Sequence, residues 1–282
     1  MNYYKKLTIV LISYKSEKKI YNFIKKIPKN IKAIIIENSN NLKLKKKIEK
    51  RYKNIKVFIK VNEGVGASIN YAAKKIKTQY LVQISPDIQF DFKQLNIFFE
   101  IAKKLNNKFS ALGPRFLKVN SQGHKQIENN IDVGSIKSVH GSFMFINKKR
   151  FNEIGKFDEN FFLYFEETDY CKRAKDIGLK AYQINDIKVK THGTTVTLNN
   201  NMEKNKLSNL LTWHFIWSKY YFSKKNYGIF ISIIIFIPIL VRAVLKLVYY
   251  KFTNNKRSLE KYSYRLSGLI TSMIGRSASL RP

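Results

Sequence analysis

The chain has 282 residues, of which 44% are hydrophobic, so it can bury a substantial core and is too apolar for wholesale disorder. Its 53 Lys and Arg face only 19 Asp and Glu, and the formal net charge of +34 fits partners that carry phosphates or an anionic membrane surface. The single cysteine, Cys171, excludes an intramolecular disulfide, fits a reducing compartment and is expected to be a small buried residue in a helix.

Short β-branched runs alternate with longer amphipathic stretches in the first part of the chain. Residues 7–12 follow two lysines, as in a signal peptide, but the run is short and lacks a small-residue cleavage site, so it is predicted to be a buried first strand. Continuous hydrophobicity implies strands covered on both faces, and the alternation with helices implies right-handed crossovers in a mainly parallel sheet. The predicted strands are 7–13, 31–37, 55–61 and 80–85, and the predicted helices are 17–26, 42–51 and 67–77.

Polar, small and acidic residues follow each predicted strand, where ligands bind in open α/β sheets. The glycine-bearing loop 62–66 suits an anion at a helix N-terminus, although a plain tight turn explains it equally well, and it lacks the G-x-G-x-x-G spacing of a dinucleotide site. Residues 85–87 present one carboxylate at a strand end, although Pro-Asp is also a common turn. The candidate ligand-binding residues at these ends are Ser13, Tyr14, Glu37, Asn38, Asn62, Gly64, Ser85 and Asp87.

Residues 155–173 pack five carboxylates among aromatic residues in a chain that is otherwise short of acid. Such a cluster predicts a general base, a metal site or a cation-binding wall, and the alternative is an acid-rich helix start. A helix is predicted over 167–177, and a position at its start favours the ionised form of Glu167, which a general base requires. Asp169 and Arg173 are spaced to pair along this helix.

These segments, taken in chain order over about residues 7–197, resemble family 2 glycosyltransferases, particularly the rhamnosyltransferase-like branch. The most specific segment is 155–173, which resembles G-G-F-D-E…F-F-x-Y-x-E-D-x-D-L-x-x-R. The other matching segments are I-S-Y-K-S at 12–16, I-I-I-E-N-S at 34–39, N-x-G at 62–64 with Asn70 and Ala73, S-P-D at 85–87, H-G-S-F-M at 140–144 and H-G at 192–193.

The chain departs from the family pattern at four positions, each by a mild chemical change. Ser85 stands where Asn or Asp is usual, Glu37 replaces Asp, and Lys156 replaces a glycine. Glu167 replaces Asp in the E-D pair, and this change matters most, because a base that is one methylene longer must be repositioned by its loop.

The resemblance implies an α/β, GT-A-type, mainly parallel open sheet flanked by helices. It implies a glycosyltransferase domain at residues 1–197, with a nucleotide-sugar half at about 1–115 and an acceptor half at about 116–197. The implied activity is the inverting, metal-dependent transfer of a sugar from a nucleotide-diphosphate sugar, with dTDP-rhamnose as the first choice and a UDP-hexose as the second. The implied acceptor is lipid-linked or a polysaccharide, in cell-surface glycan synthesis.

The resemblance also implies roles for individual residues. Glu167 would be the base, and one base without a second carboxylate nucleophile predicts a single displacement and therefore inversion. Asp87 and His192 would hold Mg²⁺ or Mn²⁺. A helix cap for Glu167, and a strand-end histidine for His192, are the alternatives. The nucleotide-binding set is Ser13, Tyr14, Glu37, Asn38, Asn62, Gly64 and Ser85, and the acceptor or sugar-pocket set is His140, Gly141, Ser142, Asp158, Glu159, Glu166 and Asp169.

Residues 198–282 differ in character and are predicted to be a helical, basic, membrane-associated region. Aromatic residues precede the apolar run 229–241, and Arg242 and Lys246 follow it. The run is too short to span a bilayer unless both basic side chains snorkel, so an interfacial or re-entrant helix is expected, and a packed soluble helix pair is the alternative. The expected location is the cytoplasmic face of the inner or plasma membrane, where positive charge meets an anionic surface.

Two other classes of function fit parts of the sequence. A basic nucleic-acid-binding protein fits the charge, but no zinc knuckle, aromatic RNA-binding signature or recognition-helix pattern accompanies it, so no nucleic-acid partner is expected. The second alternative is a transferase homologue that binds a sugar nucleotide without turnover, because Glu167 stands where Asp is usual.

Overall fold

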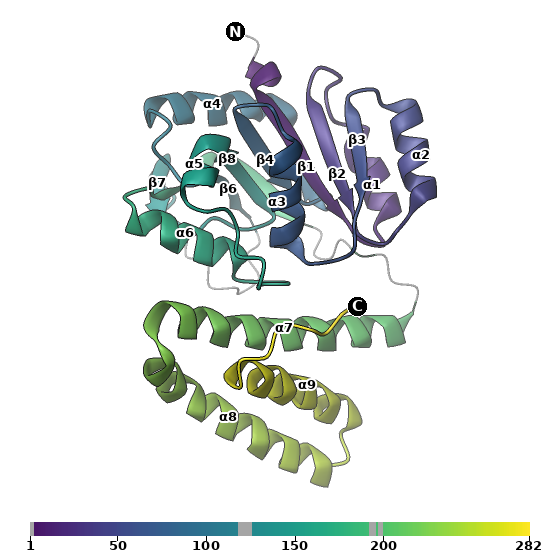
Figure 1. Ribbon diagram of the computed structural model, residues 1–282, viewed down its shortest axis with the longest axis vertical. Helices are drawn as coiled ribbons and strands as arrows, with labels where there is room; N and C mark the ends of the chain where they lie inside the picture. The colour runs from purple at the N-terminus through teal and green to yellow at the C-terminus, as the bar shows by residue number, and fades with distance from the viewer. Residues whose placement is uncertain (1–2, 118–125, 192–195, 197–199) are drawn as a thin grey trace. The chain divides into compact units, whose positions relative to one another are not determined.

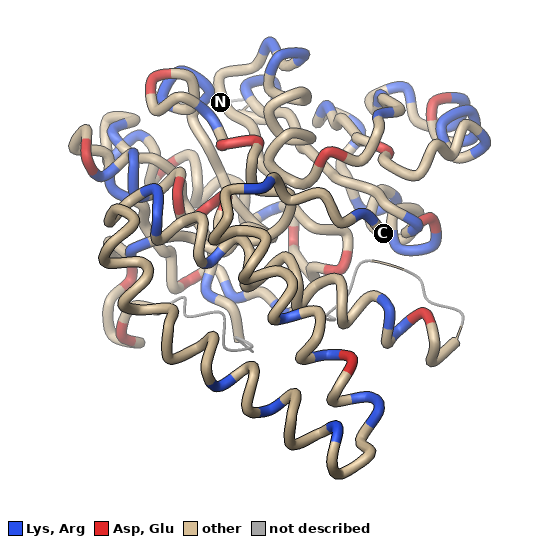
Figure 2. The backbone as a smooth tube through the Cα atoms, turned by 60° about the horizontal axis from the view of Figure 1, so that its bottom comes forward, with Lys and Arg blue, Asp and Glu red and all other residues tan. Residues whose placement is uncertain are grey.

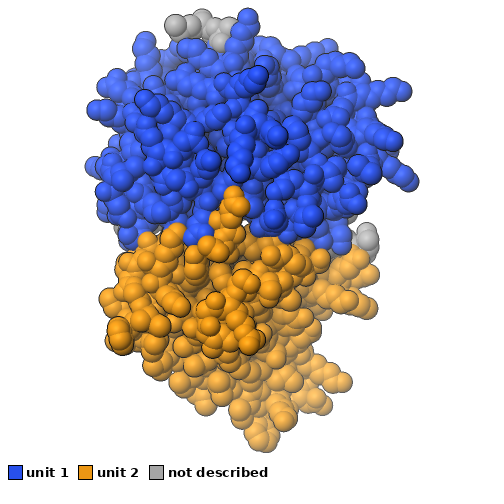
Figure 3. Space-filling view, viewed as in Figure 1, with its two compact units in different colours: residues 1–158, 166–197 blue, residues 159–165, 198–282 orange. Residues whose placement is uncertain are grey.

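The computed structural model describes residues 3–117, 126–191, 196 and 200–282 (Figure 1). The chain divides into two compact units (Figure 3). The sheet unit comprises Met1–Asp158 and Glu166–Thr197, and the helical unit comprises Glu159–Phe165 and Leu198–Pro282. A seven-residue segment of the acidic motif therefore belongs to the helical unit, although the residues on both sides of it belong to the sheet unit.

The sheet unit is built on one sheet, whose first strands are parallel. Its strands are β1 (Leu7–Ser13), β2 (Lys32–Glu37), β3 (Ile55–Ile59), β4 (Tyr80–Ile84), β5 (Ile88–Gln89), β6 (Leu112–Phe116), β7 (Val133–Ile136), β8 (Phe143–Asn147) and β9 (Ala181–Thr191). The four parallel strands lie in the spatial order β3-β2-β1-β4. All four predicted strands are confirmed to within two residues at each end, because uninterrupted β-branched runs specify strands that are buried on both faces.

The second half of the sheet is mixed and continues the order as β8-β6-β9-β5, with β7 paired to β9. Strand β8 runs antiparallel to β4, with Ile84 opposite Phe143. Because β8 begins where β4 ends, the turn before β8 lies at the carboxyl edge of the parallel strands. The mixed half thus adds residues to the same edge at which the parallel strands end.

Helices cover both faces of the sheet. They are α1 (Glu17–Ile24), α2 (Leu42–Arg51), α3 (Val65–Lys75), α4 (Leu95–Lys104), α5 (Lys148–Glu153) and α6 (Glu166–Asp176), and short 3₁₀ turns occupy Tyr3–Lys6 and Phe92–Gln94. The predicted helices are confirmed to within two residues at each end. Neighbouring residues of β1 enter opposite cores, because Ile9 packs in the core with α1, α2 and α4, whereas Val10 packs in the core with α3, α5 and α6.

The helical unit contains α7 (Asn201–Tyr227), α8 (Ile229–Phe252) and α9 (Lys256–Met273). Gly228, with φ of +83°, separates α7 from α8. Helices α7 and α9 approach closely at Gly268, where an added Cβ would lie 2.6 Å from the carbonyl oxygen of Trp213. Glycine is required at this crossing because any side chain would meet the backbone of the neighbouring helix.

Helix α8 is the one helix in the described part of the chain that is long and apolar enough to cross a membrane. It has 24 residues, and its most apolar window has a mean hydropathy of 2.5 with 17% of that window buried. Most of its large apolar side chains are therefore exposed in the isolated chain.

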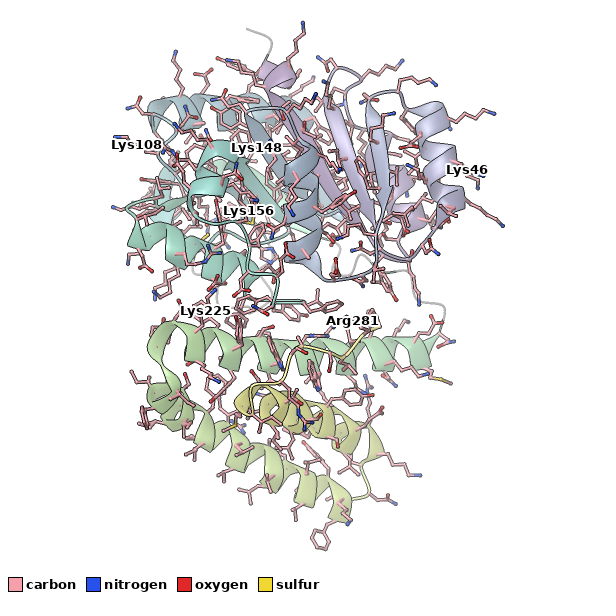
Figure 4. All side chains as sticks on the ribbon, viewed as in Figure 1. Lys46, Lys108, Lys148, Lys156, Lys225 and Arg281 are labelled. Carbon is pink, nitrogen blue, oxygen red and sulfur yellow. The ribbon has the colours of Figure 1, made fainter. Side chains whose placement is uncertain are left out.

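Positive charge is distributed over the sheet unit and is not confined to one face. Lys46 on α2 and Lys108 after α4 are exposed and project from different sides of the unit (Figure 4). The backbone colouring shows Lys and Arg on most of its helices and loops (Figure 2). This distribution favours a general compositional bias over a single nucleic-acid-binding patch.

Candidate active site

The ends of β1 and β2 place Ser13 and Asn38 next to each other. The Asn38 backbone N–H donates to the Ser13 carbonyl at 2.8 Å, and the Asn38 Nδ2 donates to Ser68 Oγ on α3 at 2.9 Å. Asn38 is buried, and its Oδ1 has no hydrogen-bond partner among the described residues. A buried acceptor without a partner is costly, so this oxygen is a candidate for contact with a ligand donor.

The Glu37 carboxylate is used by the loop that follows it. Glu37 is fully buried and accepts hydrogen bonds from the Ser39 N–H at 3.1 Å, from the Asn41 N–H at 2.7 Å and from the Ser39 hydroxyl. The carboxylate therefore stabilises the β2–α2 turn, and the unpartnered acceptor at this strand end belongs to Asn38. Tyr14, from the same predicted nucleotide set, lies half-buried directly after Ser13.

The loop before α3 reaches its conformation through glycine. Gly64 has φ of +104°, which L side chains rarely adopt, and its N–H donates to Asn62 Oδ1 at 3.3 Å. Among the residues that the structure describes, no side chain caps the N-terminus of α3. Gly66 then allows close packing, since an added Cβ would lie 3.1 Å from the Phe157 Cβ.

Asp87 is held beside the end of β9. It is 5% exposed, and Thr191 Oγ1 donates to its Oδ2 at 2.6 Å. The pairing of Ile88 with Thr191 brings these residues together. Sequence reasoning missed Thr191, although its position directly before His192 could have indicated it. His192 lies outside the described residues, so its metal role stays a prediction.

The metal-ligating groups around Asp87 fit a metal ion that binds together with the phosphates of the substrate. Within residues 3–117, 126–191, 196 and 200–282, no group of three or more His, Cys, Asp or Glu is placed to hold a metal ion. Mg²⁺ is usually bound through one or two carboxylates together with substrate phosphates and waters. A single buried carboxylate at a strand end agrees with that chemistry.

The turn formed by residues 140–142 contacts both the β4 end and Glu167. The Ser85 N–H donates to the Ser142 carbonyl at 2.8 Å, two residues before Asp87. The Ser142 N–H donates to His140 Nδ1 at 3.1 Å, which shapes the turn. A Cβ added at Gly141 would lie 3.6 Å from the carboxyl carbon of Glu167. The structure thus brings the predicted sugar-pocket turn against the predicted base.

Glu166 and Glu167 begin α6, and both are buried. Burial, and secondarily the charge of Glu167, raise the pKa of the Glu166 carboxyl well above its usual range. The raised pKa favours the protonated, uncharged form of Glu166 beside Glu167. The Glu166 Oε2 has no hydrogen-bond partner within the described chain, and Thr168 Oγ1 donates to Glu167 Oε1 at 3.3 Å.

The predicted pair of Asp169 and Arg173 forms and orders the preceding loop. Arg173 Nε donates to the fully buried Asp169 at 2.8 Å, and the guanidinium also donates to the carbonyls of Ile154 and Lys156, each at 2.5 Å. Arg115 on β6 donates to the Ile127 carbonyl at 3.0 Å and to Asn185 Oδ1 at 3.1 Å. In the described contacts, Asp169 and Arg115 both brace the fold.

Asp158 and Glu159 are divided between the two units. Asp158 is half-buried at the end of one sheet-unit segment, and Glu159 is exposed at the start of the helical-unit segment. Their predicted role in ordering the acceptor side stays a prediction.

Within the helical unit, the segment Glu159–Phe165 is held by α7 and by the last residues of the chain. Ser218 Oγ donates to the Leu163 carbonyl at 2.7 Å, and the Phe162 ring stacks on His214 at 4.6 Å and lies 4.3 Å from the Arg281 guanidinium. Burial lowers the pKa of His214 to about 4, so it is neutral at physiological pH. Sequence reasoning missed this support because these residues are more than 50 positions apart in the chain.

Cys171 is buried, as predicted for a structural residue. Burial raises the pKa of its thiol to about 12, which leaves almost no thiolate at neutral pH.

Comparison with known proteins agrees with this arrangement. The model of the family "Glycosyl transferase family 2" matches residues 8–172, more than half of the chain. The low-salt glycan biosynthesis hexosyltransferase Agl10 of Haloferax volcanii is 23% identical over 192 residues, which are 60% of this chain and 61% of that protein. The chain thus spans less than two thirds of this relative's length.

Solved structures share the fold. The mannosyltransferase PcManGT from Pyrobaculum calidifontis, in complex with GDP-Man and Mn²⁺, aligns with a TM-score of 0.57 and 8% identity over 96% of this chain and 88% of that one. S. aureus TarS 1–349, in complex with UDP-GlcNAc, aligns with a TM-score of 0.54 and 13% identity over 96% and 92%. These likenesses confirm the expected GT-A-type architecture. The family match is the finding that assigns the chain: it belongs to glycosyl transferase family 2 and is a glycosyltransferase.

Proposed function

We propose that the protein transfers a sugar from a nucleotide-diphosphate sugar to an acceptor hydroxyl by a single inverting displacement. The observation that carries this proposal is the 140–142 turn, which bonds to the β4 end at Ser85 and packs against Glu167. The diphosphate leaving group would then lie near Asp87, on one side of the 140–142 turn. The base Glu167 would lie on the other side of this turn, and both would contact the sugar.

The strand ends can accept a hydrogen bond from a nucleotide base, and we propose a pyrimidine base there. Asn38 Oδ1 is a buried acceptor, and the N3–H of uracil or thymine is a donor of the matching kind. Ser13, Tyr14, Glu37, Asn62, Gly64 and Ser85 complete the proposed nucleotide site. dTDP-rhamnose is the first candidate, in keeping with the rhamnosyltransferase-like branch, and a UDP-hexose is the second, which the hexosyltransferase name of the relative favours.

Asp87, with His192 as the second proposed ligand, would hold Mg²⁺ or Mn²⁺. Such a cation neutralises charge on the departing diphosphate when it is bound. Thr191 donates to Asp87 and so fixes the carboxylate at the strand end, where ligands bind in sheets of this kind.

Glu167 would accept the proton of the acceptor hydroxyl. As that O–H bond breaks, the acceptor oxygen bonds to the anomeric carbon, and the bond from this carbon to the diphosphate oxygen breaks with its electron pair on the nucleoside diphosphate. The raised pKa of Glu166 favours its uncharged form, which adds no opposing charge beside Glu167. His140, Gly141, Ser142, Asp158, Glu159, Glu166 and Asp169 remain the proposed surroundings of the sugar and acceptor.

A lipid-linked or polysaccharide acceptor at the cytoplasmic face of the membrane completes the proposal. The exposed apolar residues of α8 and the excess of positive charge support a membrane location. The relative's name places that protein in glycan biosynthesis.

Thermal unfolding with UDP, dTDP, GDP and ADP, each with Mn²⁺ or chelator, tests the donor site. We expect UDP or dTDP with Mn²⁺ to stabilise the protein by about 2–3 kcal/mol at saturation, and we expect Asp87→Asn to abolish this gain. Stabilisation without turnover of any sugar nucleotide would favour the non-catalytic homologue. An absence of response to all four nucleotides would contradict the proposed donor site.

A further inference from the structure

The helical unit exposes an apolar surface on α8 that resembles the lipid-facing side of an interfacial helix. Phe230 is 81% exposed and Phe252 is 86% exposed, and α8 contains no Asp or Glu. The uncharged run 229–241 has 13 residues. Such a run reaches about 20 Å, short of the roughly 30 Å of a hydrocarbon core. The whole of α8 is long enough to cross a membrane, but the charged side chains of Arg242 and Lys246 fall within that length, so the helix is suited to lie in the membrane interface.

Lys and Arg gather where α8 ends and α9 begins (Figure 2). Aromatic residues accompany them in the same stretch. Lys246 lies over the rings of Tyr249 and Tyr250 at 5.7 and 5.6 Å, and Tyr250 packs on Tyr262 of α9 at 5.5 Å. Aromatic residues and Lys or Arg are enriched at the level of lipid headgroups. This end of α8 is therefore the one expected at headgroup depth.

A polar hollow of about 320 Å³ lies between α7 and α9 in the same unit. Arg257 and Lys261, four residues apart on α9, line it together with Glu260, and Arg257 is five residues past Phe252 at the end of α8. Neither cation forms an ion pair within the described residues. Two like charges at this spacing repel each other unless an anion lies between them.

The α7 side of the hollow contributes a buried amide. Asn209 is 5% exposed, lines the hollow and makes no side-chain hydrogen bond in the part of the chain that the structure describes. The amide N–H₂ of Asn209 carries two donors and can donate to an anionic oxygen that enters the hollow. Asn205, Ser208 and Ser258 supply further polar groups around it.

We propose that this hollow binds the phosphate of an anionic phospholipid headgroup while α8 lies in the interface. Arg257 and Lys261 would contact the phosphate, and Asn209 would donate to one of its oxygens. Glu260 lines the same hollow, so the two cations and one carboxylate leave one net positive charge. This charge matches a headgroup with a single phosphodiester, such as that of phosphatidylglycerol. This inference rests on the membrane association in the proposed function and names the lipid that the protein recognises.

Vesicle co-sedimentation of the full chain tests the inference, with phosphatidylcholine alone or mixed with phosphatidylglycerol. The wild type is expected to prefer the mixed vesicles, and the double variant Arg257→Gln, Lys261→Gln is expected to lose about 10- to 30-fold of that preference, at about 1 kcal/mol for each basic residue. The matched control is Lys103→Gln, Lys104→Gln at the end of α4, which removes the same charge and is expected to change the preference less than about twofold.

The variant Asn209→Leu distinguishes specific binding in the hollow from general attraction by surface charge. The inference predicts that it reduces the preference for phosphatidylglycerol and leaves binding to phosphatidylcholine unchanged. If Asn209→Leu keeps the full preference while the double charge variant loses it, the charge acts only through the surface field and the hollow is not the site. A heat-stability gain with glycerol 1-phosphate in the absence of vesicle binding would instead assign the hollow to a soluble phosphate ester and overturn the lipid assignment.

Two further measurements distinguish a failure of the lipid proposal from a failure of the proposed function. Phe230→Asp with Ile234→Asp should abolish binding to both kinds of vesicle if α8 inserts, and unchanged binding would contradict the interfacial role of α8. UDP and dTDP stabilisation should be the same in every one of these variants, so loss of nucleotide binding in the wild type would count against the donor site and not against the lipid site.

Discussion

The two units use apolar sequence in opposite ways. Strand β1 and helix α8 are both nearly uninterrupted apolar runs, yet Leu7, Ile9 and Leu11 are fully buried, whereas Phe230 and Phe252 are more than four-fifths exposed. The sheet unit has helices on both faces to cover its strands, whereas α8 packs mainly on α7 and α9 among the described elements. A hydrophobic run thus predicts that its side chains are removed from water. Whether protein or lipid covers these side chains depends on the elements that pack beside the run in its unit.

The largest expected effect is on catalysis in the sheet unit. Replacing the base by Glu167→Gln should lower turnover by about 10²- to 10⁴-fold, because the amide cannot accept the acceptor proton. The matched change Glu166→Gln, at the preceding position, should cost much less, because burial favours the uncharged form of Glu166, which glutamine resembles. Steady-state release of nucleoside diphosphate measures both, and equal losses would contradict the assignment of the base.

Two phenylalanines sharpen the comparison of buried and exposed apolar residues. Phe145 is fully buried in the sheet core, and Phe145→Ala should lower the free energy of unfolding by about 3–5 kcal/mol. Phe230→Ala on α8 should change it by less than about 0.5 kcal/mol in the absence of lipid. Urea unfolding followed by circular dichroism compares them; a large loss at Phe230 would mean that protein, and not lipid, covers α8.

Acid should weaken the helical unit through His214. Burial holds its pKa at about 4 in the folded chain, against 6.5 for an ordinary histidine, so the unfolded chain binds more protons between these values. Stability that is present above pH 6.5 should be lost as the pH falls towards 4, by about 3 kcal/mol at most at 1.36 kcal/mol per pKa unit. His214→Gln should flatten this dependence in denaturant titrations at several pH values.

The sheet unit should show the opposite response at Glu166. Because its folded pKa is raised above the ordinary value of 4.5, the folded state binds more protons, and the contribution of this residue is greatest below pH 4.5 and falls as the pH rises. Glu166→Gln should therefore gain stability relative to the wild type as the pH is raised. A constant difference between the two proteins from acid to neutral pH would show that Glu166 titrates normally.

Local patterns in the sequence predicted the parallel half of the fold and part of the site. The β-branched runs and the four-residue spacing of Asp169 and Arg173 act over short distances, and the structure confirms both. The antiparallel pairing of β8 with β4 was beyond such patterns, because nothing near residue 143 identifies its partner more than 55 positions earlier.

Other features of the site depend on contacts between distant residues. The Glu159–Phe165 segment is continuous with its neighbours in the acidic motif, but its bonds and ring contacts to Ser218 and His214 place it in the helical unit. The use of the Glu37 carboxylate by its own loop depends on backbone geometry, which composition does not reveal.

Binding and turnover measured side by side test the central claim most directly. The account predicts that Asp87→Asn loses both metal-dependent nucleotide binding and nucleoside diphosphate release, whereas Glu167→Gln keeps binding and loses release. Retained turnover in Glu167→Gln, or loss of nucleotide binding together with turnover in that variant, would contradict the division of donor and base chemistry between the two residues.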